Sequence, residues 1–166
     1  MMLRTLFYRT AAVLALTTLA ACSSSKDDDA TPTTPVGISW TVDGVPVSTT
    51  TVQSQKGSST VSIAGTATSG TTSRYLSLEI PNAVGTYAFS SSPLALGTYT
   101  TGSSGNNTVY YAGTLPSSSG QTTLGSGTIV VTALTATNIT GTFSFTGVGQ
   151  GGATKSITAG TFNVGL

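Results

Sequence analysis

Apolar and polar side chains alternate along most of the chain after residue 36, with the two-residue period of a strand that buries one face. In the first such run, Ile38, Trp40 and Val42 share one face, and a second alternating run follows two residues later. The intervening Asp43-Gly44 favours a type I′ turn, because both central residues of that turn need a positive φ. The pattern therefore predicts a β-hairpin, with Pro46, which lacks an N–H group, in a strand at the edge of a sheet.

Further alternating runs predict more strands of the same kind. Clusters of Gly, Ser, Asn and Thr separate these runs, and the abundance of Thr and Val favours strand over helix. No run after residue 36 has a helical period. The predicted strands include 61–63, 75–80, 109–112, 128–134, 139–145 and 156–164.

Together these runs predict a single all-β domain over residues 36–166, an antiparallel β-sandwich or flattened barrel of about eight to ten strands. Such a domain is long enough to bury a core without disulfides or metal. The predicted core consists of the inward-facing large side chains of these runs, namely Trp40, Val61, Ile63, Leu76, Leu78, Ile80, Ile129, Val131, Phe143, Phe145 and Phe162.

A short sequence echo occurs near the end of the chain. Both Gly141-Thr142-Phe143 and Gly160-Thr161-Phe162 follow an Ile-Thr pair, and weaker versions occur at Gly85-Thr86-Tyr87 and Gly97-Thr98-Tyr99. The spacings are unequal, so the echo is not the period of a solenoid or propeller. We expect the last two copies to lie on neighbouring strands, where Gly permits a bulge and Phe packs inward.

Composition limits the chemistry that this chain can perform. Only 7% of its residues are charged, and six basic against five acidic residues give a net charge of +1, which argues against a nucleic-acid partner. The chain has no His and one Cys, which excludes Ser-His, Cys-His and His-metal arrangements and any internal disulfide. We expect no cofactor and no metal ion.

Ionisable side chains suited to catalysis are few in the predicted domain. Asp43 and Glu79 are its only two carboxylates, beside the cations Lys56, Arg74 and Lys155. A glycosidase needs two carboxyl groups that flank one bond. Asp43 is explained by its turn, and Glu79 lies on the polar face of a predicted strand, where Arg74 or a Lys could pair with it. We expect no enzymatic activity.

Aromatic side chains leave glycan binding open, because sugars stack on exposed rings. Alternation favours a core position for Trp40, whereas Tyr110 and Tyr111 are adjacent and must point to opposite faces, so one of them is expected to be exposed. The candidate rings are Trp40, Tyr75, Tyr87, Tyr99, Tyr110 and Tyr111.

The first 21 residues have the features of a secretory leader. Arg4 and Arg9 precede an apolar run over 11–21, which is shorter than the roughly 20 residues that a membrane span requires. The run ends in Leu19-Ala20-Ala21-Cys22, which resembles the lipobox of bacterial lipoproteins. This resemblance implies cleavage before Cys22 and attachment of a lipid to its thiol, so that the mature protein is anchored to a membrane.

Residues 22–35 are predicted to form a disordered tether, because they contain no apolar side chain large enough to offset the cost of ordering. Lys26 is followed by Asp27, Asp28 and Asp29. This run resembles the surface-export signal of lipoproteins from Bacteroidota, which implies an outer-membrane location facing the cell exterior. The alternative is a solvating charge run, with the protein on the periplasmic face.

Several motifs of the predicted domain resemble an uncharacterised family of small, β-rich Bacteroidota lipoproteins. They are the Trp-Thr-Val-Asp-Gly-Val opening at Trp40, the Gly-Thr-Tyr segments and the two closing Gly-Thr-Phe segments. The resemblance implies a domain of unknown function and supplies no catalytic residue. We therefore expect a non-catalytic envelope or cell-surface lipoprotein with a structural or adhesive role; the alternative is a carbohydrate-binding surface module. The partner, a glycan or an envelope protein, stays open.

Overall fold

The computed structural model describes residues 36–103 and 105–166. The predicted leader, Cys22 and the tether with Lys26, Asp27, Asp28 and Asp29 lie outside the described residues. Within them, one 3₁₀ turn, η1 (Gln150–Gly152), is the sole helical segment, and no helix is long and apolar enough to cross a membrane. The strands are β1 (Gly37–Val42), β2 (Val45–Thr49), β3 (Val52–Lys56), β4 (Thr60–Ser69), β5 (Thr72–Pro81), β6 (Gly85–Ala88), β7 (Leu96–Ser103), β8 (Asn106–Ser117), β9 (Gly120–Leu124), β10 (Ser126–Leu134), β11 (Asn138–Val148) and β12 (Thr154–Gly165).

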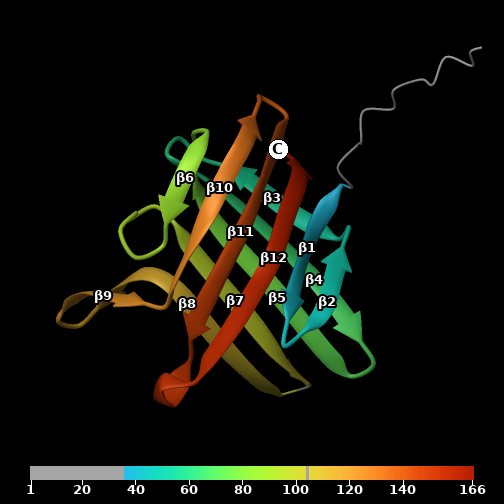
Figure 1. Ribbon diagram of the computed structural model, residues 1–166, viewed down its shortest axis with the longest axis vertical. Helices are drawn as coiled ribbons and strands as arrows, with labels where there is room; N and C mark the ends of the chain where they lie inside the picture. The colour runs from blue at the N-terminus through green and yellow to red at the C-terminus, as the bar shows by residue number, and fades with distance from the viewer. Residues whose placement is uncertain (1–35, 104) are drawn as a thin grey trace, which may run out of the picture. The chain divides into compact units, whose positions relative to one another are not determined.

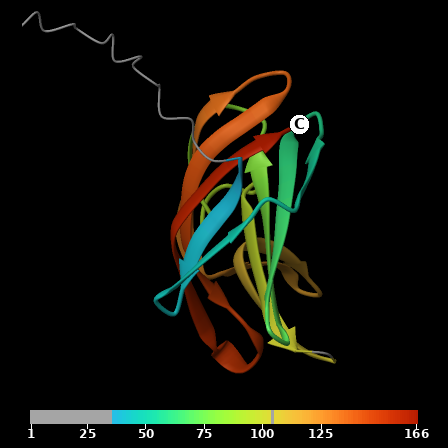
Figure 2. The same cartoon turned by 90° about the vertical axis from the view of Figure 1, so that its right-hand side faces the viewer.

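These strands form an antiparallel, nearly closed sheet in the order β2-β1-β12-β11-β8-β7-β5-β4-β3, with β10 and β6 continuing from β11 and β9 paired to β8. Figure 1 shows two layers whose strands cross. We call β6, β10, β11, β12, β1 and β2 the front layer, and β3, β4, β5, β7 and β8 the back layer; Figure 2 shows both from the side. The predicted all-β class is confirmed, and β3, β6, β7 and β9 add to the strands named from the sequence.

The predicted first hairpin is confirmed. Asp43 and Gly44 have φ angles of 52° and 75°, the left-handed conformation that a type I′ turn requires. Pro46 lies on β2, opposite Thr41 of β1. Because β2 is the last strand of the order, only one of its two edges pairs with another strand, so a residue without an N–H group is tolerated there.

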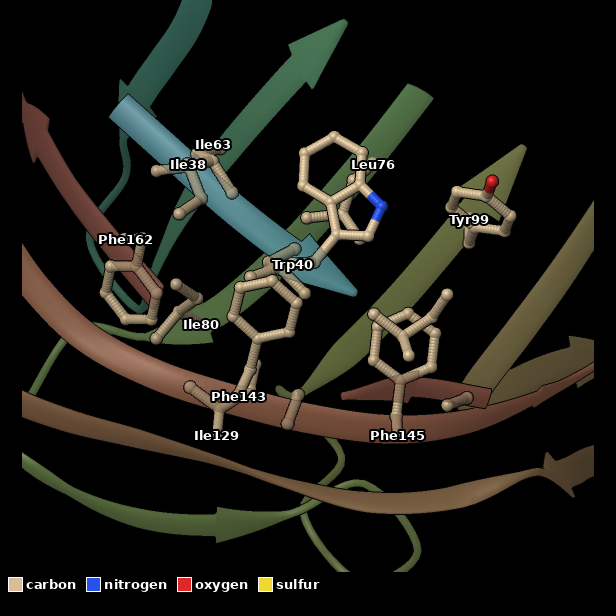
Figure 3. Close-up of a cluster of buried hydrophobic side chains, with 14 of the residues drawn as sticks. Ile38, Trp40, Ile63, Leu76, Ile80, Tyr99, Ile129, Phe143, Phe145 and Phe162 are labelled. Atoms are coloured by element: carbon tan, nitrogen blue, oxygen red, sulfur yellow. The ribbon is translucent and has the colours of Figure 1, made fainter. Parts of the chain in front are cut away.

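The core lies between the two layers, where their inner faces meet (Figure 3). All eleven predicted core residues are buried. The core also contains side chains that are not in the predicted core set, including two tyrosines: Ile38, Val42, Val47, Phe89, Ala95, Tyr99, Tyr110, Ala112, Ile139, Ile157 and Val164.

The two Gly-Thr-Phe copies lie on neighbouring strands, as expected, and face each other. Gly141 pairs with Phe162 and Phe143 pairs with Gly160 across β11 and β12. Each phenylalanine therefore lies beside the glycine of the opposite strand, and the two rings stack with centroids 6.4 Å apart. A Cβ atom on Gly160 would lie 2.5 Å from the Phe143 ring, which is closer than any ordinary contact. Glycine is needed here because the ring occupies the space of a side chain.

The expected bulge occurs beside this pair. Phe143 pairs with Gly160 but Phe145 pairs with Ile157, so β12 has one more residue than β11 over this interval. Ala159 takes a φ of 49°, which is unusual for a residue with a Cβ atom. The bulge bends β12, which pairs with β1 on its other side.

Side-chain hydrogen bonds link the two layers where the sheet does not close. Thr49 Oγ1 donates to the Thr66 carbonyl oxygen at 2.7 Å, and Ser54 Oγ donates to that of Gly165 at 2.6 Å. Lys56 Nζ donates to the Thr135 carbonyl oxygen at 3.0 Å. These bonds lie beside the end strands of the sheet, β2 and β3, whose exposed edges could otherwise pair with another chain.

The glycine–phenylalanine contact leads to a stability prediction. We expect Gly160→Ala to lower the free energy of unfolding by about 1–3 kcal/mol, because the new methyl group overpacks the Phe143 ring. Gly165→Ala is the matched control, since its Cβ would have only the Thr137 carbonyl oxygen nearby, at 3.8 Å. It should change stability by less than about 0.5 kcal/mol. Urea unfolding measures both, and equal midpoints for the two variants would contradict the packing argument.

Candidate functional site

Asp43, in the turn between β1 and β2, forms an ion pair with the start of the neighbouring strand β12, where Val42 pairs with Ile157. Lys155 Nζ, on β12, lies 2.9 Å from Asp43 Oδ2. The ammonium also lies 5.7 Å from the centroid of the Tyr110 ring, within the range of a cation–π contact. The hydrogen bond to Asp43 raises the pKa of Lys155 above its ordinary value of 10.5; partial burial opposes this effect and the charge of Asp43 adds to it. Asp43 thus helps to join the hairpin to β12.

Glu79 lies in a different part of the domain, on the exposed face of β5. Its carboxylate accepts a hydrogen bond of 3.2 Å from Ser62 Oγ on β4. The expected pairing of Glu79 with Arg74 or a Lys is wrong, because Lys155–Asp43 is the sole ion pair among the described residues. Arg74 is five positions from Glu79 on the same strand, and alternation places it on the opposite face.

The ionisable groups of the domain are therefore dispersed. Asp43 and Glu79, the two carboxylates, have separate partners on different layers, and Lys56 donates to a backbone carbonyl. Residues 36–103 and 105–166 contain no cluster of three Cys, Asp or Glu side chains that could hold a metal ion. The arrangement offers neither a paired acid and base nor a ligand set.

The candidate aromatic rings have different environments. Trp40, Tyr99 and Tyr110 are buried, as predicted for Trp40. The expectation that one of Tyr110 and Tyr111 is exposed is wrong, because Tyr110 is buried between the layers and Tyr111 is half-buried. Tyr87 is also half-buried, and its hydroxyl donates to the Ala83 carbonyl oxygen at 3.0 Å. This leaves Tyr75, at 39% exposed, as the sole exposed aromatic side chain in the described part of the chain.

A shallow cleft of about 490 Å³ lies beside Tyr75 on the outer surface of the back layer. Strand pairing explains its shape, because Gln53, Ala64 and Ser77 lie side by side on β3, β4 and β5. The two small side chains, Ala64 and Ser77, leave a low floor between larger neighbours. We call this feature the Tyr75 cleft; its lining residues are Gln53, Ser54, Gln55, Ser62, Ile63, Ala64, Tyr75 and Ser77.

One wall of the Tyr75 cleft was predicted from the sequence and the other was not. Tyr75 was among the candidate rings, but Gln53 and Gln55 lie on β3, which has too few apolar residues to show alternation. The available signal was the spacing of the two glutamines, which places both amides on one face of a strand.

A larger hollow of about 640 Å³ lies near the start of β1 and the end of β4. Its walls are backbone, hydroxyl-bearing and aliphatic residues such as Ser39, Thr49 and Thr66, without an aromatic or charged side chain. It therefore lacks groups that would orient a ligand strongly.

The ion pair gives a prediction on stability and pH. Asp43 is 63% exposed, so we expect Asp43→Asn, which suits the same turn, to lower the free energy of unfolding by only about 0.2–1 kcal/mol. Because the folded-state pKa of Lys155 is raised, the contribution is complete below pH 10.5 and is lost as the pH rises through the folded value. Chemical unfolding at neutral and strongly alkaline pH should therefore show the two proteins converging. If Asp43→Asn remains less stable than the parent at alkaline pH, the loss arises from the turn and not from the ion pair. Arg74→Gln is the control for the loss of a charge and should show no such dependence on pH.

Comparison with known proteins gives a family and no activity. Searches of the curated proteins and of the solved structures found no match to this chain. A family model described as Domain of unknown function (DUF6252) matches residues 39–165, from within β1 to the end of β12. The chain therefore belongs to the DUF6252 family of domains of unknown function.

Proposed function

We propose that this chain is a non-catalytic, lipid-anchored lipoprotein of a bacterial envelope, with a structural or adhesive role. The observation that carries the proposal is the position of Cys22. It is the only cysteine in the chain, and it follows Leu19-Ala20-Ala21 at the end of a short apolar run. Small residues before a cysteine suit cleavage by a peptidase, and a thiol is the nucleophile that accepts a lipid.

The proposed anchor holds the protein at a membrane without spanning it. A single acyl chain gives reversible binding, whereas two or more give stable attachment, at about 0.8 kcal/mol per buried methylene group. The tether over 22–35 would then separate the β domain from the lipid surface. Its proline and threonine content favours an extended chain.

The proposed location is the outer membrane of a member of the Bacteroidota, with the domain facing the cell exterior. The support is the resemblance of Lys26-Asp27-Asp28-Asp29 to a surface-export signal. If the run acts only by solvation, the protein stays on the periplasmic face. The proposed membership of a lipoprotein family agrees with this location.

The absence of catalysis is proposed from the dispersion of the ionisable groups. Glycoside hydrolysis needs two carboxyl groups about 5–9.5 Å apart on either side of one bond. Asp43 is paired with Lys155 in the front layer, whereas Glu79 and its hydrogen-bond donor Ser62 both lie in the back layer. The chain has no histidine to activate its many hydroxyl groups.

The second candidate function is a carbohydrate-binding surface module. It is favoured by one observation, the exposure of the Tyr75 ring beside a cleft lined by amide and hydroxyl side chains. An aromatic ring with polar groups around it is a common surface for stacking sugars.

The anchor is tested by Cys22→Ala. We expect the variant to be unprocessed or soluble and to take up no labelled fatty acid, because the thiol that accepts the lipid is gone. Metabolic labelling and mass spectrometry of the purified protein measure this. Ser25→Ala, three residues later, is the control and should be lipidated normally. Native protein that retains Met1 and carries no lipid would overturn the proposal.

The export signal is tested by replacing Asp27, Asp28 and Asp29 with Ala. Protease added to intact cells should digest much less of this variant than of the parent, since the variant stays on the periplasmic side. The control replaces Thr31, Thr33 and Thr34 with Ala in the same tether and should be digested like the parent. Equal digestion of all three proteins would reject the signal.

A further inference from the structure

We propose that the Tyr75 cleft binds a neutral oligosaccharide, with one sugar ring stacked on Tyr75 and hydroxyl groups of the adjoining sugar units bonded to the amides of Gln53 and Gln55. This inference rests on the second candidate function above and gives it a site and a ligand class. It does not depend on the lipid anchor.

The aromatic wall of the cleft is accessible because its neighbours are short. Tyr75 lies opposite Thr66 on β4 and Thr100 on β7, so no large side chain faces it across either strand pair. The next outward residue along β5 is Ser77, which is part of the cleft floor. A planar ligand that lies over Ser77 and Ala64 would therefore contact the Tyr75 ring directly.

The polar wall offers groups that have no other partner. Gln53 and Gln55 are exposed on β3, and neither amide makes a hydrogen bond with any described residue. Each amide provides two donors and one acceptor oxygen, which suits the mixed donors and acceptors of adjacent sugar hydroxyls. Ser62 Oγ donates to the Glu79 carboxylate, which orients the Ser62 hydroxyl at one end of the cleft.

The charge around the cleft selects against anionic ligands. None of its lining residues is charged. The nearest cation along β3, Lys56, points to the other face of the strand and donates to the Thr135 carbonyl oxygen. The carboxylate of Glu79 is next to Ser62, so the local field would repel phosphate, sulfate or uronate groups. A neutral sugar avoids this repulsion.

The size and depth of the cleft predict weak binding. Its volume of about 490 Å³ falls in the range of small-molecule sites. It is open on one side and has a single ring, so we expect a dissociation constant on the order of 1 mM for one site. Many anchored copies on one surface would bind a polysaccharide more tightly than one copy does.

The test uses the full-length protein as it is purified from cells, whether or not it carries a lipid, in detergent micelles. It is titrated by NMR with a panel of neutral tetrasaccharides of glucose, xylose, mannose and galactose, and with tetragalacturonate as the anionic comparison. We expect saturable binding of at least one neutral member and little or none of tetragalacturonate. A preference for tetragalacturonate would overturn this inference but not the second candidate function, because tetragalacturonate is itself a carbohydrate. No binding of any member of the panel, tetragalacturonate included, at concentrations up to about 10-fold above the expected constant would overturn both.

Variants of the cleft residues test whether an oligosaccharide that binds the protein does so in the Tyr75 cleft. Tyr75→Thr keeps a strand-forming residue and should weaken binding at least about 10-fold, whereas Tyr75→Phe should keep it within about 2-fold. Gln53→Ala and Gln55→Ala should each weaken binding about 3-fold to 10-fold. Thr142→Ala, on the outer surface of the front layer, is the matched control and should bind like the parent. Urea midpoints confirm that each variant is folded.

The outcomes of these variants are distinct. Oligosaccharide binding that Tyr75→Thr leaves unchanged would overturn the Tyr75 cleft as the site and leave carbohydrate binding as a function elsewhere on the surface. Loss of binding in Tyr75→Thr with retention in Tyr75→Phe would support the site. Neither result bears on lipidation of Cys22, which is tested separately.

Discussion

The front layer depends on the reciprocal packing of two phenylalanines on two glycines. Phe143 lies opposite Gly160 and Phe162 opposite Gly141, so one register of β11 against β12 accommodates both rings. A slip of one residue would move each ring to the outer surface and leave the space beside each glycine empty. Because β11 also pairs with β10 and β12 with β1, this register is passed to the strands on either side.

The low charge of the chain shapes what its surface can recognise. The polar side chains on the outer faces of the domain are mainly Ser, Thr, Asn and Gln. Its described ion pair, between Asp43 and Lys155, joins the first hairpin to β12. Recognition through such a surface relies on hydrogen bonds and ring stacking, which salt screens far less than it screens ion pairs. The proposed neutral ligand is consistent with this composition.

Alternation revealed the strands that bury a row of large apolar side chains and missed strands that lack such a row. Leu76, Leu78 and Ile80 on β5 were assigned to the core because each is large, apolar and two residues from the next. β3 was not predicted because four of its five residues are exposed, and β7 was not predicted because glycine interrupts its inner face beside Tyr99. One wall of the Tyr75 cleft was missed for the same reason, since Gln53 and Gln55 carry no hydrophobic signal.

Local patterns along the chain were enough to predict the all-β class, the first hairpin and most of the large side chains of the core, because these depend on turn geometry and on which residues avoid water. The lipobox-like segment at Cys22 is also a local pattern. The meeting of Asp43 with Lys155, the lack of a cationic partner for Glu79 and the cleft that Tyr75 shares with two glutamines became visible only in the folded sheet. These contacts join strands that are distant in the chain or unmarked by hydrophobicity, so they arise only when the sheet brings its strands into register.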